Sequence, residues 1–182
     1  MLNVCLAAFF KESAMAIGFA RFGFVQRSAG KNACCKAAYY ARDKVHFEST
    51  SFAEAKTYNW SHKEKPAYHA LCLPAHVDAK FKSIEALWNA AEQKENRHNS
   101  QIAMEMVLAL PDDQVISLED KIELVQSFID EYFVKKGLAV QIDIHRPDQK
   151  ILLSPETGEV ENLDHNWHAH ILLTTRRFKE NG

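Results

Sequence analysis

Alternation of apolar and polar side chains is the clearest pattern along this chain, and it predicts four extended strands. The four segments are residues 16–25 (AIGFARFGFV), 101–111 (QIAMEMVLALP), 138–147 (LAVQIDIHRP) and 164–175 (DHNWHAHILLTT). A further segment, AYHALCLPAHV, predicts a short edge strand that Pro74 ends. The last three long strands each have one apolar face, which should lie against a core.

Apolar residues three and four positions apart predict three helices. The first begins near Ser28 and contains ACCKAAYYA, and the second lies in SIEALWNAAEQKE. The third runs from Ser117 to Lys136, and Gly137 ends it. Asp120, three residues after Ser117, indicates a weak form of the capping box.

The order of these elements favours an α+β fold. We expect a largely antiparallel central sheet with helices packed on one face and the other face open. Within a Pro- and Gly-marked loop at residues 146–164, LSPETGEV suggests a small hairpin. The 182 residues suit one domain, to which we assign residues 15–182, leaving residues 1–14 as an extension without a predicted role.

Composition narrows the class of protein. Hydrophobic residues make up 47% of the chain and charged residues 25%, as in soluble globular proteins. No apolar run reaches the roughly 18 residues that span a bilayer, so membrane insertion is not expected. The four cysteines lack CxxC spacing, which favours the reducing cytoplasm. The net charge is −2, but residues 21–66 hold nine basic and four acidic residues, which favours either a phosphate-facing surface or merely a solvated one.

Histidines on the polar strand faces suggest a metal site. His168 and His170 are two residues apart, so they share one face of a strand, and His145 and Glu105 lie on the corresponding faces of two other strands. Three neutral imidazoles can hold a catalytic divalent ion, whereas the alternative is a set of hydrogen-bonded histidines on a solvated face. Glu105 is either an orienting carboxylate beside a ligand imidazole or an exposed strand residue.

A nucleophile is also expected, and the tyrosines of AAYYAR are the best candidates. A phenol has a pKa of about 10 and needs help at neutral pH, which Lys36, Arg42 or a metal-bound phosphate could supply. Cys34 and Cys35 lie on an alanine-rich helix and are interpreted as packed thiols.

The segments RSAGKNACCKAAYYARDK, IHRPD and NWHAHILLTTRR together resemble the relaxase domain of conjugative and mobilisation proteins. The resemblance is to the MobA/MobL branch, which includes the TraA-type relaxases of the HUH endonuclease superfamily, and it covers roughly residues 15–178. Two positions depart from the family pattern. Tyr40 follows Tyr39 where Arg or Asn is more usual, and the segment between His145 and His168 is long. His165 in that segment is a spare imidazole.

The resemblance implies site- and strand-specific DNA nicking and strand transfer at an origin of transfer, through a 5′-phosphotyrosine intermediate. By position, Tyr39 matches the nucleophile, and Glu105 matches the acidic residue of the family. His145, His168 and His170 match the ligands of a divalent metal ion, with Mn²⁺ or Mg²⁺ expected and Zn²⁺, Ni²⁺ or Co²⁺ as alternatives. TraA-type members continue beyond this domain, so the chain is expected to be the N-terminal part of a longer protein.

The expected partner is single-stranded or extruded origin-of-transfer DNA, with relaxosome accessory proteins and a type IV secretion coupling protein as further partners. Stacking and phosphate contacts are the expected modes of binding. The candidates for them are Arg21, Arg27, Lys31, Lys36, Arg42 and Trp167, with Tyr58 and Trp60 as additional aromatic residues. We expect a cytoplasmic protein, exported during transfer only while attached to DNA. Two alternatives stay open: a rolling-circle replication initiator with the same chemistry, and a non-catalytic single-stranded DNA binder.

Overall fold

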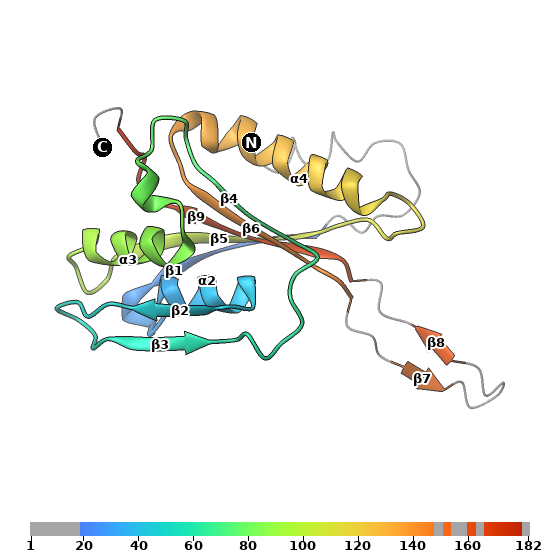
Figure 1. The fold of residues 1–182 in the computed structure, drawn as a ribbon, viewed down its shortest axis with the longest axis horizontal. Coiled ribbons are helices and arrows are strands. Elements are labelled where there is room, and N and C mark those ends of the chain that lie inside the picture. Colours follow the sequence, from blue (N-terminus) through green and yellow to red (C-terminus); the bar gives the residue numbers. More distant parts are fainter. Residues whose placement is uncertain (1–18, 148–150, 154–159, 163–165, 180–182) are drawn as a thin grey trace.

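A five-stranded antiparallel sheet forms the centre of the molecule in the computed structural model, which describes residues 19–147, 151–153, 160–162 and 166–179 (Figure 1). The strand order is β1-β5-β9-β6-β4. The strands are β1 (Ala20–Gln26), β4 (Tyr68–Cys72), β5 (Gln101–Ala109), β6 (Val140–His145) and β9 (His168–Thr174). All four predicted strands and the predicted edge strand are therefore confirmed where the structure describes them, while residues 1–18 lie outside the described part.

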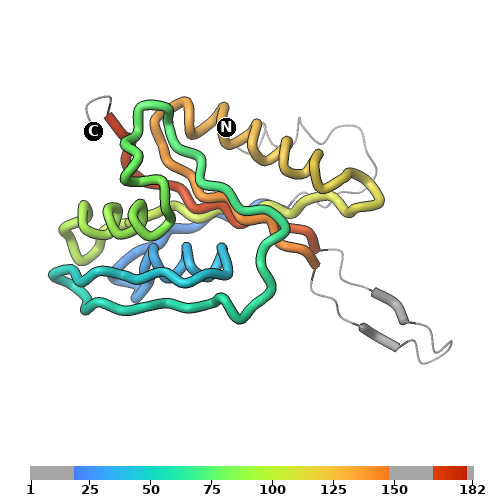
Figure 2. Tube along the Cα trace, in the orientation of Figure 1, coloured from blue at the N-terminus to red at the C-terminus, as the bar shows by residue number. Residues whose placement is uncertain are grey.

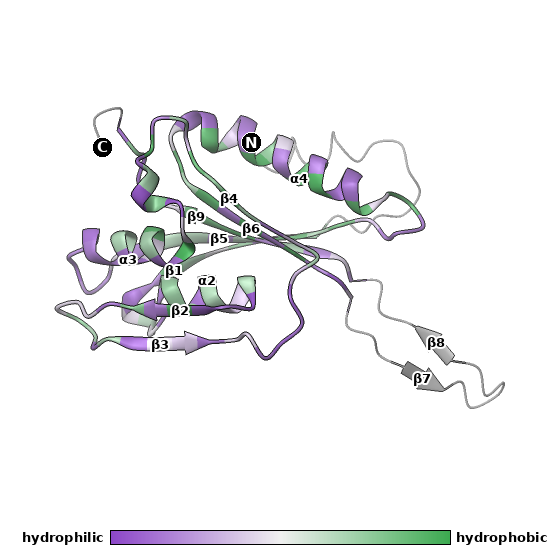
Figure 3. Cartoon of the chain, viewed as in Figure 1, coloured by the Kyte–Doolittle hydropathy of each residue, from purple (hydrophilic) through white to green (hydrophobic). Residues whose placement is uncertain are grey.

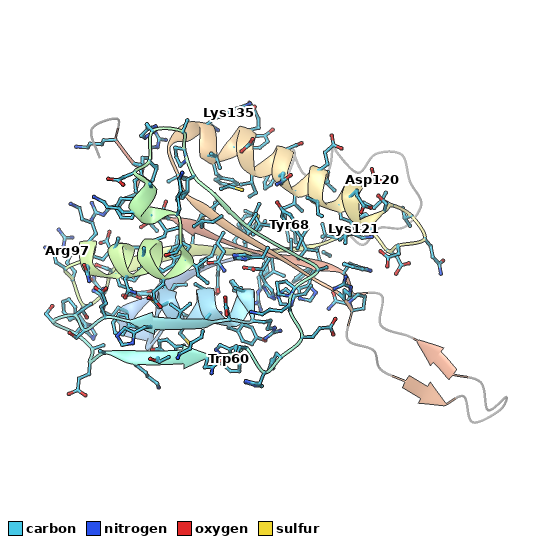
Figure 4. The ribbon with its side chains drawn as sticks, in the orientation of Figure 1. Trp60, Tyr68, Arg97, Asp120, Lys121 and Lys135 are labelled. Atoms are coloured by element: carbon cyan, nitrogen blue, oxygen red, sulfur yellow. The ribbon has the colours of Figure 1, made fainter. Side chains whose placement is uncertain are left out.

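Helices cover both faces of this sheet (Figure 1). α4 (Leu118–Tyr132) packs on the face that carries Met106, Ile142 and Ile171. α2 (Ala33–Ala41) and α3 (Ile84–Lys94) pack on the opposite face. The α+β class and the antiparallel sheet are confirmed, but the expected open face is wrong. Figure 4 shows the two sides, with Trp60 on the α2 side and Lys121 on the α4 side.

The alanines of α2 explain why a helix can cover the more polar face of the sheet. Ala33, Ala37 and Ala38 are fully buried, and side chains this small let the helix backbone lie close to the strands. The Ala37 carbonyl accepts a hydrogen bond from Gln141 Nε2 of β6 at 3.1 Å. Beside α2, β2 (Lys44–Phe47) and β3 (Lys56–Asn59) form an antiparallel pair. Polar strand residues on this face thus find partners in the helix layer rather than in water.

Local signals account for the helix boundaries. The side chain of Asn32 caps α2 by accepting from the Cys35 amide at 3.0 Å. The predicted capping box of α4 is confirmed, because Ser117 and Asp120 bond reciprocally. α4 ends at Tyr132 rather than at Lys136, and a short 3₁₀ turn, η3 (Val134–Lys136), leads to Gly137 at φ 89°. Polar and apolar residues alternate along α4 (Figure 3).

Strand β9 lies at the centre of the sheet, between β5 and β6 (Figure 2). Its residue His168 stands opposite His145 of β6, and His170 stands opposite Asp143. Between β6 and β9, β7 (Ile151–Leu153) and β8 (Val160–Asn162) pair as the expected hairpin. In the described part of the chain, no helix is both long and apolar enough to cross a bilayer.

Candidate active site

Three imidazoles meet where β6 and β9 run side by side. The ring centroids of His145 and His168 are 5.5 Å apart, those of His145 and His170 5.1 Å, and those of His168 and His170 4.9 Å. Antiparallel pairing places His145 directly opposite His168, and the two-residue repeat of β9 places His170 on the same face. The shared face predicted from the sequence is confirmed. His165 lies outside the described residues.

The ring nitrogens of this cluster differ in their partners. His145 Nε2 bonds with the Tyr40 carbonyl oxygen at 2.8 Å, and His168 Nδ1 bonds with that of Asn166 at 2.8 Å. His170 Nδ1 is buried and has no hydrogen-bond partner among the described residues. Burial lowers the pKa of His170 to about 2, with smaller contributions from His168 and His145. His170 is therefore neutral at physiological pH, which is the form that can bind a metal.

The cluster fits a divalent ion in the chemistry of its donors. Imidazoles that ligate metals usually bond through their other ring nitrogen to a carbonyl or carboxylate, and His145 and His168 each have such a carbonyl partner. The orphaned His170 Nδ1 would gain a partner from an ion. As the rings stand, however, no three His, Cys, Asp or Glu side chains of the described residues are arranged to hold a metal ion. Binding would require a reorientation of the rings.

Tyr40 is packed into the site with its hydroxyl engaged. Only 2% of its surface is exposed, and its hydroxyl donates to Glu105 Oε2 at 2.9 Å. Its ring stacks on His170 with centroids 4.1 Å apart and an interplanar angle of 9°. Burial and the neighbouring Glu105 carboxylate raise the pKa of the Tyr40 phenol, which opposes its ionisation.

Tyr39 is half-buried and lies on a different side of α2, as neighbouring helix positions must. Its ring and that of Trp60 are nearly perpendicular, with centroids 5.1 Å apart, and its centroid is 6.5 Å from that of His170. The guanidinium carbon of Arg42 lies 4.2 Å from the Tyr39 ring centroid, and Lys63 Nζ lies 5.8 Å from it. Tyr39 thus stands beside the histidines among cationic groups.

Glu105 is the acidic centre of a second cluster that adjoins the histidines. Its carboxylate oxygens lie 2.9 Å from Lys36 Nζ and 3.5 Å from Lys31 Nζ, and Tyr40 donates to it. Burial alone would raise the pKa of Glu105, but the bonds from Lys36 and Tyr40 outweigh it and lower the pKa. With 8% of its surface exposed, Glu105 is not the solvated strand residue of the alternative interpretation. Its hydrogen bond from Tyr40 orients the Tyr40 ring and, through ring stacking, His170.

Two features of the site were not assigned from the sequence. Gly23 of β1 stands opposite Glu105, and a Cβ there would lie 2.9 Å from Glu105 Oε1, so Gly23 provides the space for this side chain. Asp143 is fully buried beside His170 and bonds with His69 Nδ1 at 2.6 Å and Gln141 Nε2 at 2.7 Å. The sequence could have indicated Asp143, because it lies two residues before His145 and therefore on the same face of the strand.

The residues expected to contact DNA fall into two groups. Lys31, Lys36 and Arg42 lie around the site, and Arg21 is exposed on β1 with its charge acting on Tyr40. Arg27 instead bonds with carbonyl oxygens near the end of α3 and with Glu92 at 3.1 Å, which is a structural role. Trp167 is 5% exposed in the core beneath α4, with Lys121 Nζ 4.7 Å from its ring, so the expected base stacking is not supported.

The known proteins whose sequences resemble this chain are conjugal transfer and mobilization proteins. Residues 31–182 match the family model described as the MobA/MobL family. The chain is 26% identical to the conjugal transfer protein TraA of Agrobacterium fabrum over 92% of this chain and 14% of that protein. It is also 26% identical to the mobilization protein MobL of Acidithiobacillus ferridurans, over 87% of this chain and 42% of that protein. The chain therefore spans less than half the length of these relatives.

One solved structure has a fold similar to that of this chain. It is described as "Molecular Basis of Vancomycin Resistance Transfer in Staphylococcus aureus". The two chains superpose with a TM-score of 0.71 at 28% identity, covering 91% of this chain and 74% of the other.

Proposed function

The chain belongs to the MobA/MobL family, and from this premise we propose that it is a relaxase domain that nicks one DNA strand at an origin of transfer and becomes covalently attached to it. The observation that carries the proposal is the position of a half-buried tyrosine beside three converging imidazoles. The names of the relatives, which are conjugal transfer and mobilization proteins, favour transfer over replication initiation.

Tyr39 is the proposed nucleophile. Its phenol oxygen forms a bond to the phosphorus of the scissile phosphate and loses its proton, while the bond from phosphorus to the preceding nucleotide's 3′ oxygen breaks. That oxygen takes up a proton and leaves as a free 3′-OH, and the 5′ phosphate stays on Tyr39. Trp60 and Arg42 hold the ring of Tyr39 in place for this attack.

His145, His168 and His170 are the proposed ligands of a divalent ion, for which Mn²⁺ or Mg²⁺ is expected. Such an ion would offset the negative charge that collects on the phosphoryl oxygens in the transition state. Tyr40 and Glu105 have a supporting role, because the stacked Tyr40 ring fixes the plane of His170 and Glu105 fixes Tyr40. Lys31 and Lys36 keep the Glu105 carboxylate ionised.

A covalent-adduct assay tests the nucleophile. The protein is incubated with Mn²⁺ and single-stranded oligonucleotides that tile both strands of the DNA flanking its gene, and adducts are resolved on denaturing gels. We expect an adduct with one oligonucleotide, its loss in Tyr39→Phe, and its retention in Tyr40→Phe. Loss in Tyr40→Phe alone would reassign the nucleophile. Binding of DNA without any adduct would indicate a non-catalytic single-stranded DNA binder.

Calorimetry tests the metal site independently of DNA. Mn²⁺ titrated into the metal-free protein should bind, and His168→Ala should lose that binding together with adduct formation. His62→Ala serves as the matched control, because His62 lies beside Trp60 and outside the cluster. Undiminished Mn²⁺ affinity in His168→Ala would remove this residue from the ligand set.

A further inference from the structure

Arg42 has a backbone conformation that its residue type does not favour. It follows the last residue of α2 at φ 51° and ψ 46°, and it is the one described residue other than glycine with a positive φ. Helices often end on such a left-handed residue, and glycine is the usual one because it has no Cβ to clash. A strained backbone that persists at the edge of a site suggests that the side chain is needed there.

The side chain of Arg42 lies beside the proposed nucleophile without a protein partner for one of its nitrogens. Its guanidinium carbon is 4.2 Å from the centroid of the Tyr39 ring. Its Nη1 atom is buried and makes no hydrogen bond within the described part of the chain. This nitrogen can therefore donate to an incoming acceptor without giving up a hydrogen bond within the described part of the chain.

The nearby carboxylate does not occupy this guanidinium. Asp143 already bonds with His69 at 2.6 Å and with Gln141 at 2.7 Å. Arg42 forms no ion pair with any carboxylate among the described residues, although its charge acts on both Asp143 and His170. A planar, permanently charged donor group therefore lies over the Tyr39 ring, near enough to His170 for its charge to act there, with capacity to bind an anion.

On the basis of the relaxase activity proposed above, we propose that Arg42 is a further catalytic residue, which binds the non-bridging oxygens of the phosphate that Tyr39 attacks. Guanidinium and phosphate match geometrically as bidentate partners. During the transfer, the phenol–phosphorus bond forms as the bond to the 3′ oxygen breaks, and negative charge is spread over the oxygens that Arg42 contacts. Arg42 stays protonated throughout, and it also holds the phosphotyrosine that results.

The substitution Arg42→Gly separates this role from a structural one, because the two roles predict opposite changes. Glycine relieves the left-handed strain, so the melting temperature should stay the same or rise. Loss of a charged donor at the transition state should lower the single-turnover rate of adduct formation by about 10²–10³-fold. An unchanged rate would overturn the proposal, as would a lower rate accompanied by a lower melting temperature.

Two further measurements make the test specific. Arg42→Lys keeps the positive charge but lacks the paired N–H donors of a guanidinium. This variant should therefore retain only part of the wild-type rate of adduct formation. Guanidinium chloride at a low, non-denaturing concentration should partly restore adduct formation in Arg42→Gly and not in Tyr39→Phe. The bidentate assignment would be overturned if guanidinium failed to rescue Arg42→Gly and Arg42→Lys formed the adduct at the wild-type rate. Arg42 would then contribute only a positive charge.

The phosphate site is also measurable without DNA cleavage. Tungstate, a phosphate mimic, should bind the wild-type protein in calorimetry and bind Arg42→Gly at least tenfold more weakly. If the wild-type protein forms no adduct with any oligonucleotide but tungstate binding depends on Arg42, the relaxase proposal fails and the anion site stands. If adducts form and neither the rate nor tungstate binding depends on Arg42, the inference about Arg42 alone fails.

Discussion

At the scale of single residues, the adjacent tyrosines of α2 have different surroundings. Tyr39 lies among Trp60, Arg42 and Lys63, whereas Tyr40 is buried against Glu105 and His170. A helix turns by about 100° per residue, so both side chains cannot take the same position. The structure thereby gives Tyr40, an unusual residue beside the expected nucleophile, a packing and hydrogen-bonding role.

Removing the Tyr40 hydroxyl should weaken the fold more than the chemistry. In Tyr40→Phe, the buried Glu105 carboxylate loses one donor, which we expect to lower the free energy of unfolding by about 1–3 kcal/mol in urea denaturation. Adduct formation should continue within a few-fold of the wild-type rate. Tyr58→Phe is the control, because Tyr58 is a partly buried tyrosine packed against the same core cluster, whereas the hydroxyl that Glu105 accepts from is that of Tyr40. Equal losses of stability in both variants would contradict the role given to Tyr40.

Sequence alone predicted the histidine cluster and several residues around it, but not the contacts that these residues make. His145, His168 and His170 share a face because strand periodicity is fixed, so their convergence follows from pairing β6 with β9. The contacts of Glu105 and Arg42 depend on how α2 docks on the sheet and on side-chain conformation. The burial of Trp167 was not foreseen, because an aromatic residue near a site has the same sequence signal whether it is exposed or buried.

At the scale of elements, the helix that carries Tyr39 depends on its cap. Asn32 caps α2 and Ser117 caps α4 on the opposite face of the sheet. Asn32→Ala and Ser117→Ala should each cost about 1 kcal/mol of stability. Asn32→Ala should in addition slow adduct formation, because α2 presents Tyr39, whereas Ser117→Ala should leave the rate unchanged.

Paired denaturation and single-turnover assays would check this contrast. Equal rates in the two cap variants would show that the beginning of α2 does not influence the position of Tyr39. A slow Ser117→Ala variant would show that the rate follows stability in general rather than the geometry of α2.

Element boundaries were predicted well for the strands and for the beginning of α4, whereas α2 begins at Ala33 rather than near Ser28, because Asn32 caps it and Arg27–Ala29 form a separate 3₁₀ turn. The capping box of α4 and the alternation in β5, β6 and β9 were read from the sequence and are confirmed. The alternation along β5 would place Ile102 on the face of Met106, but Ile102 joins the core beneath α2 and α3, next to an irregularity in the pairing of β1 with β5. The covering of both sheet faces was missed, because the alanines of α2 indicate a buried stripe without saying which face they bury.

At the scale of the whole molecule, Glu105 links stability to pH. Its pKa in the folded protein is lowered, because Lys36 and Tyr40 outweigh burial. A lowered folded pKa means that the stabilisation is present above the unfolded value, about 4.5, and is lost as pH falls through the folded pKa. We expect Glu105→Gln to flatten the loss of stability below pH 4.5, as measured by urea denaturation across pH. If the stability of Glu105→Gln fell below pH 4.5 as steeply as that of the wild type, this assignment would be contradicted.

The central place of β9 has a consequence for biosynthesis. β9 contains the last described strand residues, yet it separates β5 from β6 in the finished sheet. While the ribosome is still making residues 168–174, β5 and β6 can pair only with their outer neighbours, β1 and β4, and two of the three histidines do not yet exist. The three-histidine cluster therefore cannot assemble until residues 168–174 have been made, so the proposed metal site is one of the last parts of the described fold to form.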